Sequence, residues 1–224
     1  MNWAAIVVAA GRGTRFGGPK QLVDLGGKPM LAWSLRTFAS MEELGALVVV
    51  TEPQWIDAVT ELVAQLHAHC YTAVVRGGAT RQQSVRRGLD ATPVECDAVF
   101  VHDGARPLVQ AGDVRAGMRE VRAGRGAVLG ARVVDTIKIV DPATMLVERT
   151  LNREELWAAQ TPQFALRQEL MRAHEHAERE GIEATDDVAL LERIGIDVVL
   201  VPASGENFKV THPADVARAT AHLP

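Results

Sequence analysis

Short apolar runs alternate along the chain with longer segments in which apolar residues recur every three or four positions. The first run, residues 3–10, is rich in alanine, valine and isoleucine and has no polar alternation, which is typical of a parallel strand buried on both faces. Strands that alternate with helices indicate a doubly wound α/β fold with a mostly parallel sheet. Further strands are predicted over 45–51, 72–75, 97–101, 126–133 and 198–201, and helices over 30–39, 54–67, 80–89, 113–123, 166–179, 186–194 and 214–222.

Residues 134–161 interrupt this alternation. Two short extended segments, 136–140 and 146–150, flank Asp141-Pro142-Ala143-Thr144, which is a turn sequence. The pattern predicts a β-hairpin arm inserted into a single domain that spans residues 1–224. Because the arm has too little apolar surface for a core of its own, we expect it to pack on a second subunit.

Composition narrows the classes of function. The chain has 224 residues, of which 47% are hydrophobic and 23% charged, as in ordinary soluble domains. A net charge of −4 argues against nucleic acid or an anionic membrane as a partner. The apolar runs are shorter than the roughly 18 residues that cross a bilayer, and no signal peptide is expected. Two cysteines at no metal-binding spacing favour a cytoplasmic protein.

A glycine-rich loop, residues 11–21, follows the first predicted strand. It departs from the dinucleotide-binding pattern because Phe16 stands in place of the third glycine, and from the Walker pattern because a proline precedes its lysine. Its backbone N–H groups and two cations, Arg15 and Lys20, suit a polyphosphate and the pyrophosphate that leaves during group transfer. Taken alone, the loop is equally compatible with a plain glycine-rich connection.

Polar residues also follow later strands. Asp103 ends the fourth strand and, as a hard oxygen ligand, suits Mg²⁺ held together with substrate phosphates. It is also compatible with capping the turn or pairing with Arg106. Lys209 follows the last strand, where it is either a phosphate-binding cation or an ordinary surface lysine. Because ligands of open α/β sheets bind beyond the carboxyl ends of the strands, we expect these residues to share one site with the glycine-rich loop.

Six sequence blocks occur in order along nearly the whole chain, and with them the sequence resembles the 2-C-methyl-D-erythritol 4-phosphate cytidylyltransferase family of the non-mevalonate isoprenoid pathway. The blocks are Ala9-Ala10-Gly11-x-Gly13-x-Arg15 with Pro19-Lys20-Gln21, Gly77-Gly78-x-x-Arg81-x-x-Ser84-Val85, His102-Asp103-x-Ala105-Arg106-Pro107, Asp135-Thr136-x-Lys138, Thr161-Pro162-Gln163 and Lys209-Val210-Thr211. The sequence departs modestly from the family's pattern at Ala79, where relatives often have a polar residue, and at Asp186-Asp187, where Asp-Glu is frequent.

The resemblance implies a Rossmann-like nucleotidyltransferase sheet, a homodimer and a set of site residues. Each arm would reach the neighbouring subunit's site. The implied roles are CTP triphosphate binding and catalysis by Arg15, Lys20 and Lys209, Mg²⁺ binding by Asp103, nucleotide binding around Ala10, Gly11, Gly13, Gly77, Gly78 and Ser84, and acceptor binding by Arg106, Thr136, Arg153 and Thr185.

The reaction that the resemblance implies is attack by a phosphate oxygen of methylerythritol phosphate on the α-phosphorus of CTP, with pyrophosphate leaving in line. A phosphate monoester is mostly ionised at pH 7, so this chemistry requires no strong general base. Three alternatives stay open from the sequence. They are the same transfer to ribitol 5-phosphate, a nucleotide-binding regulator without turnover, and a nicotinamide-binding domain, against which Phe16 counts.

Overall fold

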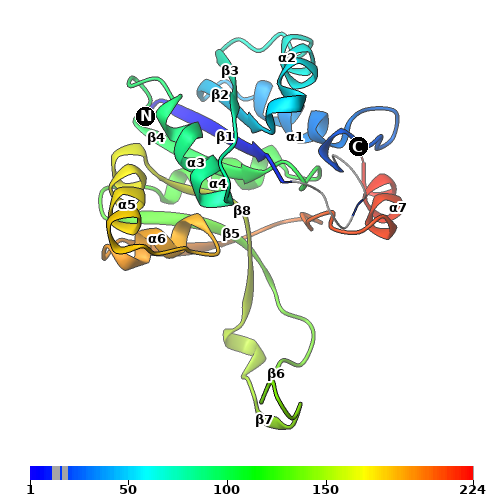
Figure 1. Ribbon diagram of the computed structural model, residues 1–224, viewed down its shortest axis with the longest axis vertical. Helices are drawn as coiled ribbons and strands as arrows, with labels where there is room; N and C mark the ends of the chain where they lie inside the picture. The colour runs from blue at the N-terminus through cyan, green and yellow to red at the C-terminus, as the bar shows by residue number, and fades with distance from the viewer. Residues whose placement is uncertain (12–15, 17–19, 224) are drawn as a thin grey trace.

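A seven-stranded sheet forms the centre of the computed structural model, which describes residues 1–11, 16 and 20–223 (Figure 1). The strand order is β3-β2-β1-β4-β8-β5-β9. Six of these strands run parallel to one another, whereas β8 runs antiparallel to both of its neighbours. The strands are β1 (Trp3–Ala9), β2 (Leu44–Thr51), β3 (Tyr71–Arg76), β4 (Ala98–Asp103), β5 (Arg125–Arg132), β8 (Trp157–Leu166) and β9 (Asp197–Pro202).

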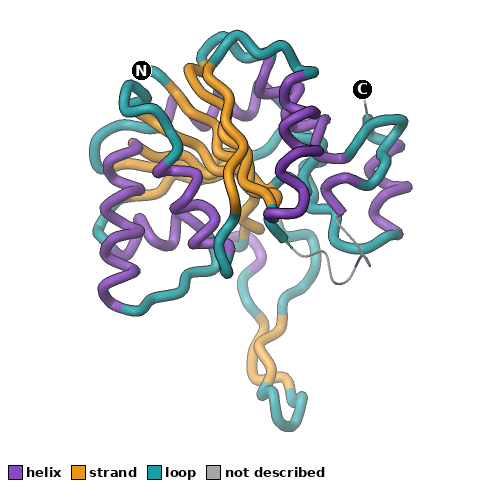
Figure 2. The backbone as a smooth tube through the Cα atoms, turned by 45° about the horizontal axis from the view of Figure 1, so that its top comes forward, coloured by secondary structure: helices purple, strands orange, loops and turns teal. Residues whose placement is uncertain are grey.

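Helices cover both faces of this sheet, as Figure 2 shows. Alternate residues of β1 enter two separate apolar clusters, Val7 with α1, α2 and α4 on one face and Ile6 with α3, α5 and α6 on the other. The prediction that this strand is buried on both faces is therefore confirmed. The helices are α1 (Met30–Ala39), α2 (Ile56–Ala64), α3 (Arg81–Asp90), α4 (Ala111–Glu120), α5 (Arg167–Glu180), α6 (Asp187–Arg193) and α7 (Ala214–Ala221). Among the described residues, no helix has both the length and the apolar character that a membrane crossing requires.

The strand β8 differs from the sequence prediction. The pattern places residues 134–161 in the arm and predicts a helix from residue 166, with no strand between them. In the structure, residues 157–166 form one continuous strand between β4 and β5. Its first half is largely exposed and its second half is buried, so the segment has neither a uniform apolar run nor regular alternation along its length. Its hydrogen-bonding partners are distant in sequence, and local patterning carries no signal for them.

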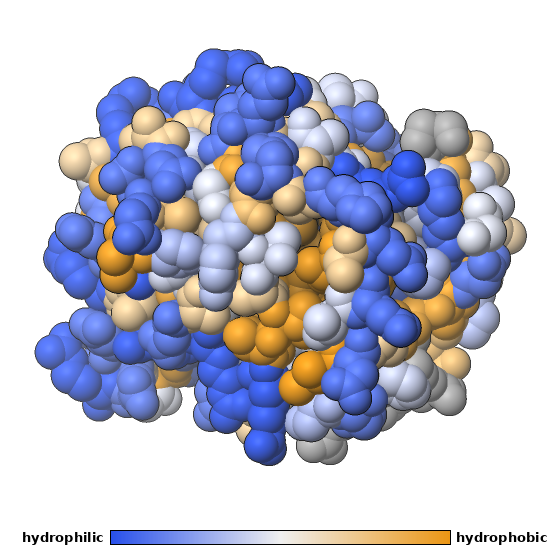
Figure 3. All heavy atoms as spheres, turned by 90° about the horizontal axis from the view of Figure 1, so that it is seen from above, coloured by the Kyte–Doolittle hydropathy of each residue, from blue (hydrophilic) through white to orange (hydrophobic). Residues whose placement is uncertain are grey.

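The arm itself projects from the body as a two-stranded antiparallel ribbon, β6 (Lys138–Val140) and β7 (Val147–Thr150). The short helix η4 (Arg153–Glu155) lies between this ribbon and β8 (Figure 1). The predicted turn is present, because Asp141 Oδ1 accepts hydrogen bonds from the backbone N–H groups of Ala143 and Thr144, both at 2.8 Å. Several large apolar side chains of this region are exposed, namely Val134, Met145, Leu146 and Val147. On the face opposite the arm, hydrophilic residues surround a central apolar area (Figure 3).

Two glycines of α4 lie in opposite environments and provide a test of how closely this helix packs on β8. A Cβ atom at Gly117 would lie 2.3 Å from the Phe164 ring, whereas no atom of the described residues lies within 4 Å of a Cβ at Gly112. Gly117→Ala is expected to lower the free energy of unfolding by about 1–3 kcal/mol through overpacking. Gly112→Ala is expected to leave it unchanged or raise it by up to about 1 kcal/mol, because alanine favours helix. Urea unfolding measures both, and equal stabilities would contradict the close packing.

Candidate functional site

A cavity of about 1190 Å³ opens at the carboxyl ends of β1 to β4. The strand register aligns these ends, because Asp103 of β4 pairs with Val8 of β1, and Thr51 of β2 pairs with Ala9 on one side and Arg76 of β3 on the other. The walls are therefore made by segments far apart in the sequence. They include Ala10 and Gly11 after β1, Lys20 and Gln21, Glu52 to Gln54 after β2, Arg76 to Arg81 around the start of α3, and Lys209.

The cavity is strongly cationic. Among the described residues that line it, Lys20, Arg76, Arg81, Arg87 and Lys209 are positively charged, against the two carboxylates of Glu52 and Asp103. A concave wall with this excess of positive charge concentrates anionic ligands. The backbone segments after β1 and β3 add N–H groups of glycine, which approach a ligand closely. The cavity is thus suited to a polyanion with a part that packs against backbone.

Asp103 is held between two cations. Arg81 Nε lies 3.1 Å from Oδ1, and Lys209 Nζ lies 2.8 Å from Oδ2. Burial by itself raises the pKa of Asp103, but the positive charges of Arg81 and Lys209 outweigh burial and hold the pKa well below its usual value. The carboxyl is therefore charged at neutral pH. The sequence alternative of an ion pair with Arg106 is wrong in geometry, because Arg106 Nη1 instead donates to the carbonyl of Asn207 at 2.8 Å.

Arg81 also ties this site to α6. Its Nη2 lies 2.7 Å from Oδ2 of Asp187, in the first turn of that helix. Gln163 of β8 fixes the same turn, since its Oε1 accepts hydrogen bonds from the backbone N–H groups of Asp187 and Val188. Two carboxylates thus bind the guanidinium of Arg81, one at Nε and one at Nη2, and together they fix its orientation.

A buried polar network supports Asp103 from behind. The Thr161 hydroxyl oxygen accepts a hydrogen bond from the backbone N–H of Asp103 at 3.0 Å and lies 3.2 Å from His102 Nδ1. His102 Nε2 lies 3.0 Å from the carbonyl oxygen of Arg106, which can only accept, so we assign the ring proton to Nε2. Burial lowers the pKa of His102 to about 4, which keeps the ring neutral. Asn207 Nδ2 donates to the Thr161 carbonyl and extends the network to the segment that carries Lys209.

The backbone after β3 packs closely against the residue that follows β1. A Cβ atom at Gly77 would lie 2.3 Å from that of Ala10, so only glycine fits there. The hydroxyl of Ser84 accepts a hydrogen bond from the backbone N–H of Gly78 at 3.0 Å and donates to the Thr80 carbonyl at 2.9 Å. Ser84 therefore orients Gly78, in addition to lining the cavity.

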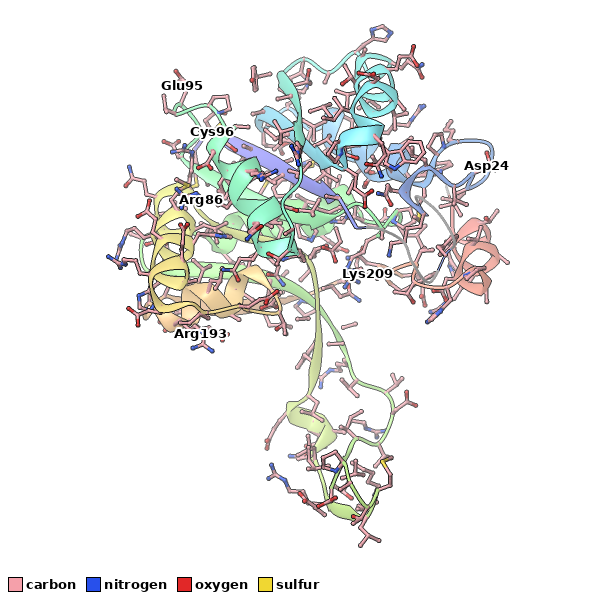
Figure 4. The ribbon with its side chains drawn as sticks, viewed as in Figure 1. Asp24, Arg86, Glu95, Cys96, Arg193 and Lys209 are labelled. Carbon is pink, nitrogen blue, oxygen red and sulfur yellow. The ribbon has the colours of Figure 1, made fainter. Side chains whose placement is uncertain are left out.

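The glycine-rich loop enters the cavity through its last residues. Lys20 Nζ donates to the carbonyl of Val210 at 3.1 Å, and the Gln21 side chain donates to the carbonyl of Ala9. The end of the loop is thereby held against both β1 and the segment that carries Lys209, which Figure 4 shows on the side of the body from which the arm projects. Arg15 and Gly13, which the sequence assigns to the same site, lie outside the described residues.

The four residues predicted to bind an acceptor are not brought together within one chain. Thr136 and Arg153 are exposed in the arm, where Arg153 Nη1 donates to the Val134 carbonyl at 2.9 Å. Thr185 is exposed just before α6, and Arg106 is bonded to Asn207. All four belong to the described part of the chain, and the residues that line the cavity do not include them.

Sequence reasoning missed several residues that line or support the cavity: Glu52, Gln54, Arg76, Arg87, Arg81, His102, Thr161 and Asn207. Glu52 and Arg76 stand at the ends of predicted strands, where topology alone could have pointed to them. Arg81, His102 and Thr161 stand inside the blocks that carry the family resemblance, but their side chains were given no role. Nothing local marks Arg87 or Asn207, because their partners come from other parts of the chain.

Comparison with known proteins bears on this site. The family model for 2-C-methyl-D-erythritol 4-phosphate cytidylyltransferase matches residues 3–224. A protein of Streptomyces coelicolor with that name is 43% identical over 233 residues, which cover 98% of this chain and 84% of the relative. A second, of Gloeobacter violaceus, is 40% identical and covers 97% of this chain and 94% of its own length.

Solved structures of proteins with this activity in their names have a similar fold along the whole chain. The crystal structure of the Francisella tularensis 2-C-methyl-D-erythritol 4-phosphate cytidylyltransferase matches with a TM-score of 0.83 and 29% identity, over 100% of both chains. A 4-diphosphocytidyl-2C-methyl-D-erythritol synthase from Anaerococcus prevotii matches with a TM-score of 0.85 and 26% identity, over 98% of this chain and 97% of the other. With full-length agreement in sequence and in fold, the chain belongs to the 2-C-methyl-D-erythritol 4-phosphate cytidylyltransferase family of nucleotidyltransferases.

Proposed function

We propose that this chain transfers the cytidylyl group of CTP to 2-C-methyl-D-erythritol 4-phosphate and releases pyrophosphate. The observation that carries the proposal is the cationic cavity at the ends of β1 to β4, in a chain whose full length matches this family. The cavity holds charged groups that neutralise a triphosphate, and glycine-lined backbone against which a flat base can pack.

Catalysis in this site follows from alignment and charge. A phosphate oxygen of the acceptor attacks the α-phosphorus of CTP, and the bond to the departing pyrophosphate breaks on the opposite side. Lys20 and Lys209 lie where they can neutralise the charge that grows on the phosphate oxygens, and Arg15 is assigned the same role from the sequence. No covalent intermediate is needed. The buried, neutral His102 supports Asp103 through Thr161 and is not among the described residues that line the cavity.

The residues present fit one divalent metal ion. Within the part of the chain that the structure describes, no group of three or more His, Cys, Asp or Glu side chains could cage a metal by itself. A single ionised carboxylate at the mouth of the sheet, Asp103, is the donor set expected where substrate phosphates complete the coordination of Mg²⁺. Bound Mg²⁺ would neutralise phosphate charge and orient the triphosphate.

The acceptor half of the site is proposed to come from two subunits. Thr136 and Arg153 lie on an arm that projects from the body and exposes apolar side chains, so the arm has unsatisfied packing surface and cationic side chains for a phosphate. If a second copy of the chain covers this surface, the arm of the first subunit lies beside the cavity of the second. We therefore propose a homodimer with shared sites.

The proposed activity is tested by release of pyrophosphate from CTP and Mg²⁺ with purified protein. Release is expected with methylerythritol phosphate and not with ribitol 5-phosphate, and excess EDTA is expected to abolish it. Release with ribitol 5-phosphate alone would change the acceptor. Absence of release with both acceptors, by protein that unfolds cooperatively, would contradict the enzyme proposal.

Lys20→Ala is expected to lower kcat by about 100-fold or more, because it removes a cation aimed at the phosphates. Lys28→Ala is the matched control. Lys28 lies in the turn before α1, over the ring of Trp33, and does not line the cavity. Steady-state pyrophosphate release measures both variants. A Lys20→Ala enzyme with a near-normal rate would show that the glycine-rich loop has another role.

Mixed dimers test the shared site. Lys20→Ala and Arg153→Ala proteins are each expected to be weakly active, and unfolding and refolding them together is expected to restore about a quarter of wild-type activity. Half of the dimers are then mixed, and one of the two sites in each combines an intact cavity with an intact arm. If cavity and arm act within one chain, the mixture stays as inactive as its components.

A further inference from the structure

Glu52 is a carboxylate in the cavity wall without an evident structural task. It follows β2 directly and precedes the short helix η3 (Pro53–Trp55), whose N-cap position it occupies without any side-chain capping bond. Its Oε2 accepts a hydrogen bond from Gln54 Nε2 at 2.5 Å. Its Oε1 is buried, and within residues 1–11, 16 and 20–223 it has no hydrogen-bond partner. Buried carboxylate oxygens are nearly always paired, so this atom calls for a donor.

The position of Glu52 in the sheet shows which part of a ligand it would meet. Asp103 and Lys209 mark the phosphate end of the cavity at β4. In the strand order, β1 separates β4 from β2, and neighbouring strands are about 4.8 Å apart, so the end of β2 lies about 10 Å from that of β4. A nucleotide with its phosphates at β4 therefore extends its nucleoside toward β2 and β3.

One neighbouring cation, Arg87, is directed toward the backbone after β3. Arg87 Nη1 donates to the carbonyls of Arg76 and Gly77, which holds the segment after β3 in place. The structure shows no ion pair between Glu52 and any described residue. Glu52 lines the cavity, so a bound ligand can supply the donor that Oε1 lacks among the described residues. In related open sheets, an acidic residue after the second strand binds a ribose hydroxyl, which is the same topological position.

We propose that Glu52 is a specificity-determining residue whose Oε1 accepts a hydrogen bond from a donor on the nucleoside. This deepens the proposed function and rests on it. A cytidine nucleotide offers three such donors, the 2′-hydroxyl, the 3′-hydroxyl and the 4-amino group. A carboxylate accepts only from donors, so Glu52 selects a ligand that has one at this place and rejects an analogue that lacks it.

The test compares Glu52→Ala with wild type on four nucleotides: CTP, 2′-deoxy-CTP, 3′-deoxy-CTP and UTP. For CTP, KM is expected to rise about tenfold with kcat close to wild type, since a hydrogen bond to a charged group is lost from binding. For the analogue that lacks the donor, the KM of the variant is expected to be no higher than that of wild type, and that analogue identifies the donor. Glu52→Gln, which keeps the shape of the side chain, is expected to recover part of the CTP affinity.

Glu61→Ala is the matched control, because Glu61 is an exposed carboxylate on α2 outside the cavity. It is expected to match wild type with all four nucleotides. If Glu52→Ala and Glu52→Gln both keep the wild-type ratios of KM between CTP and every analogue, the role of Glu52 is refuted while the enzyme remains a cytidylyltransferase. Refutation of the proposed function gives a different result from refutation of the Glu52 role, because wild type itself would then release no pyrophosphate from CTP.

Discussion

The carboxylate of Asp103 is the interaction on which the rest of the site depends. Arg81 reaches it from α3 and Lys209 from the segment after β9, so one side chain gathers residues from three distant parts of the chain. Two cations beside a mostly buried carboxylate keep it ionised where burial alone would favour the neutral acid. Such a centre is sensitive to its partners, since removal of one member of a buried pair leaves an uncompensated charge.

The antiparallel strand β8 makes this centre rigid. It inserts between β4 and β5, and from it Thr161 bonds the backbone of Asp103 while Gln163 bonds the first turn of α6. Asp187 of that turn holds the far end of Arg81. The same strand begins where the arm ends, so the chain that carries Arg153 away from the body returns directly into the strand that supports Asp103.

The cavity divides along the strand order. In the proposed binding mode, the phosphate end lies at β1 and β4, with Lys20, Asp103 and Lys209, and the nucleoside end lies at β2 and β3, with Glu52 and the glycines after β3. The residues assigned to the acceptor lie elsewhere, on the arm and beside α6. Among the described residues, the cavity of a single chain thus includes those proposed to bind the nucleotide and none of those proposed to bind the acceptor, which is why we propose a second subunit as the source of the arm.

The sequence by itself determined the α/β class, the helices, the strands other than β8 and the presence of the arm, because each depends on local periodicity or on turn residues such as Asp141. It also pointed to Lys20, Asp103 and Lys209, since polar residues after buried strands share one edge of the sheet. Only the tertiary structure decided that β8 enters the sheet, that Asp103 pairs with Arg81 and not with Arg106, and that Glu52 keeps an oxygen without a partner among the described residues. These features arise between residues far apart in the chain, and no local pattern encodes such contacts.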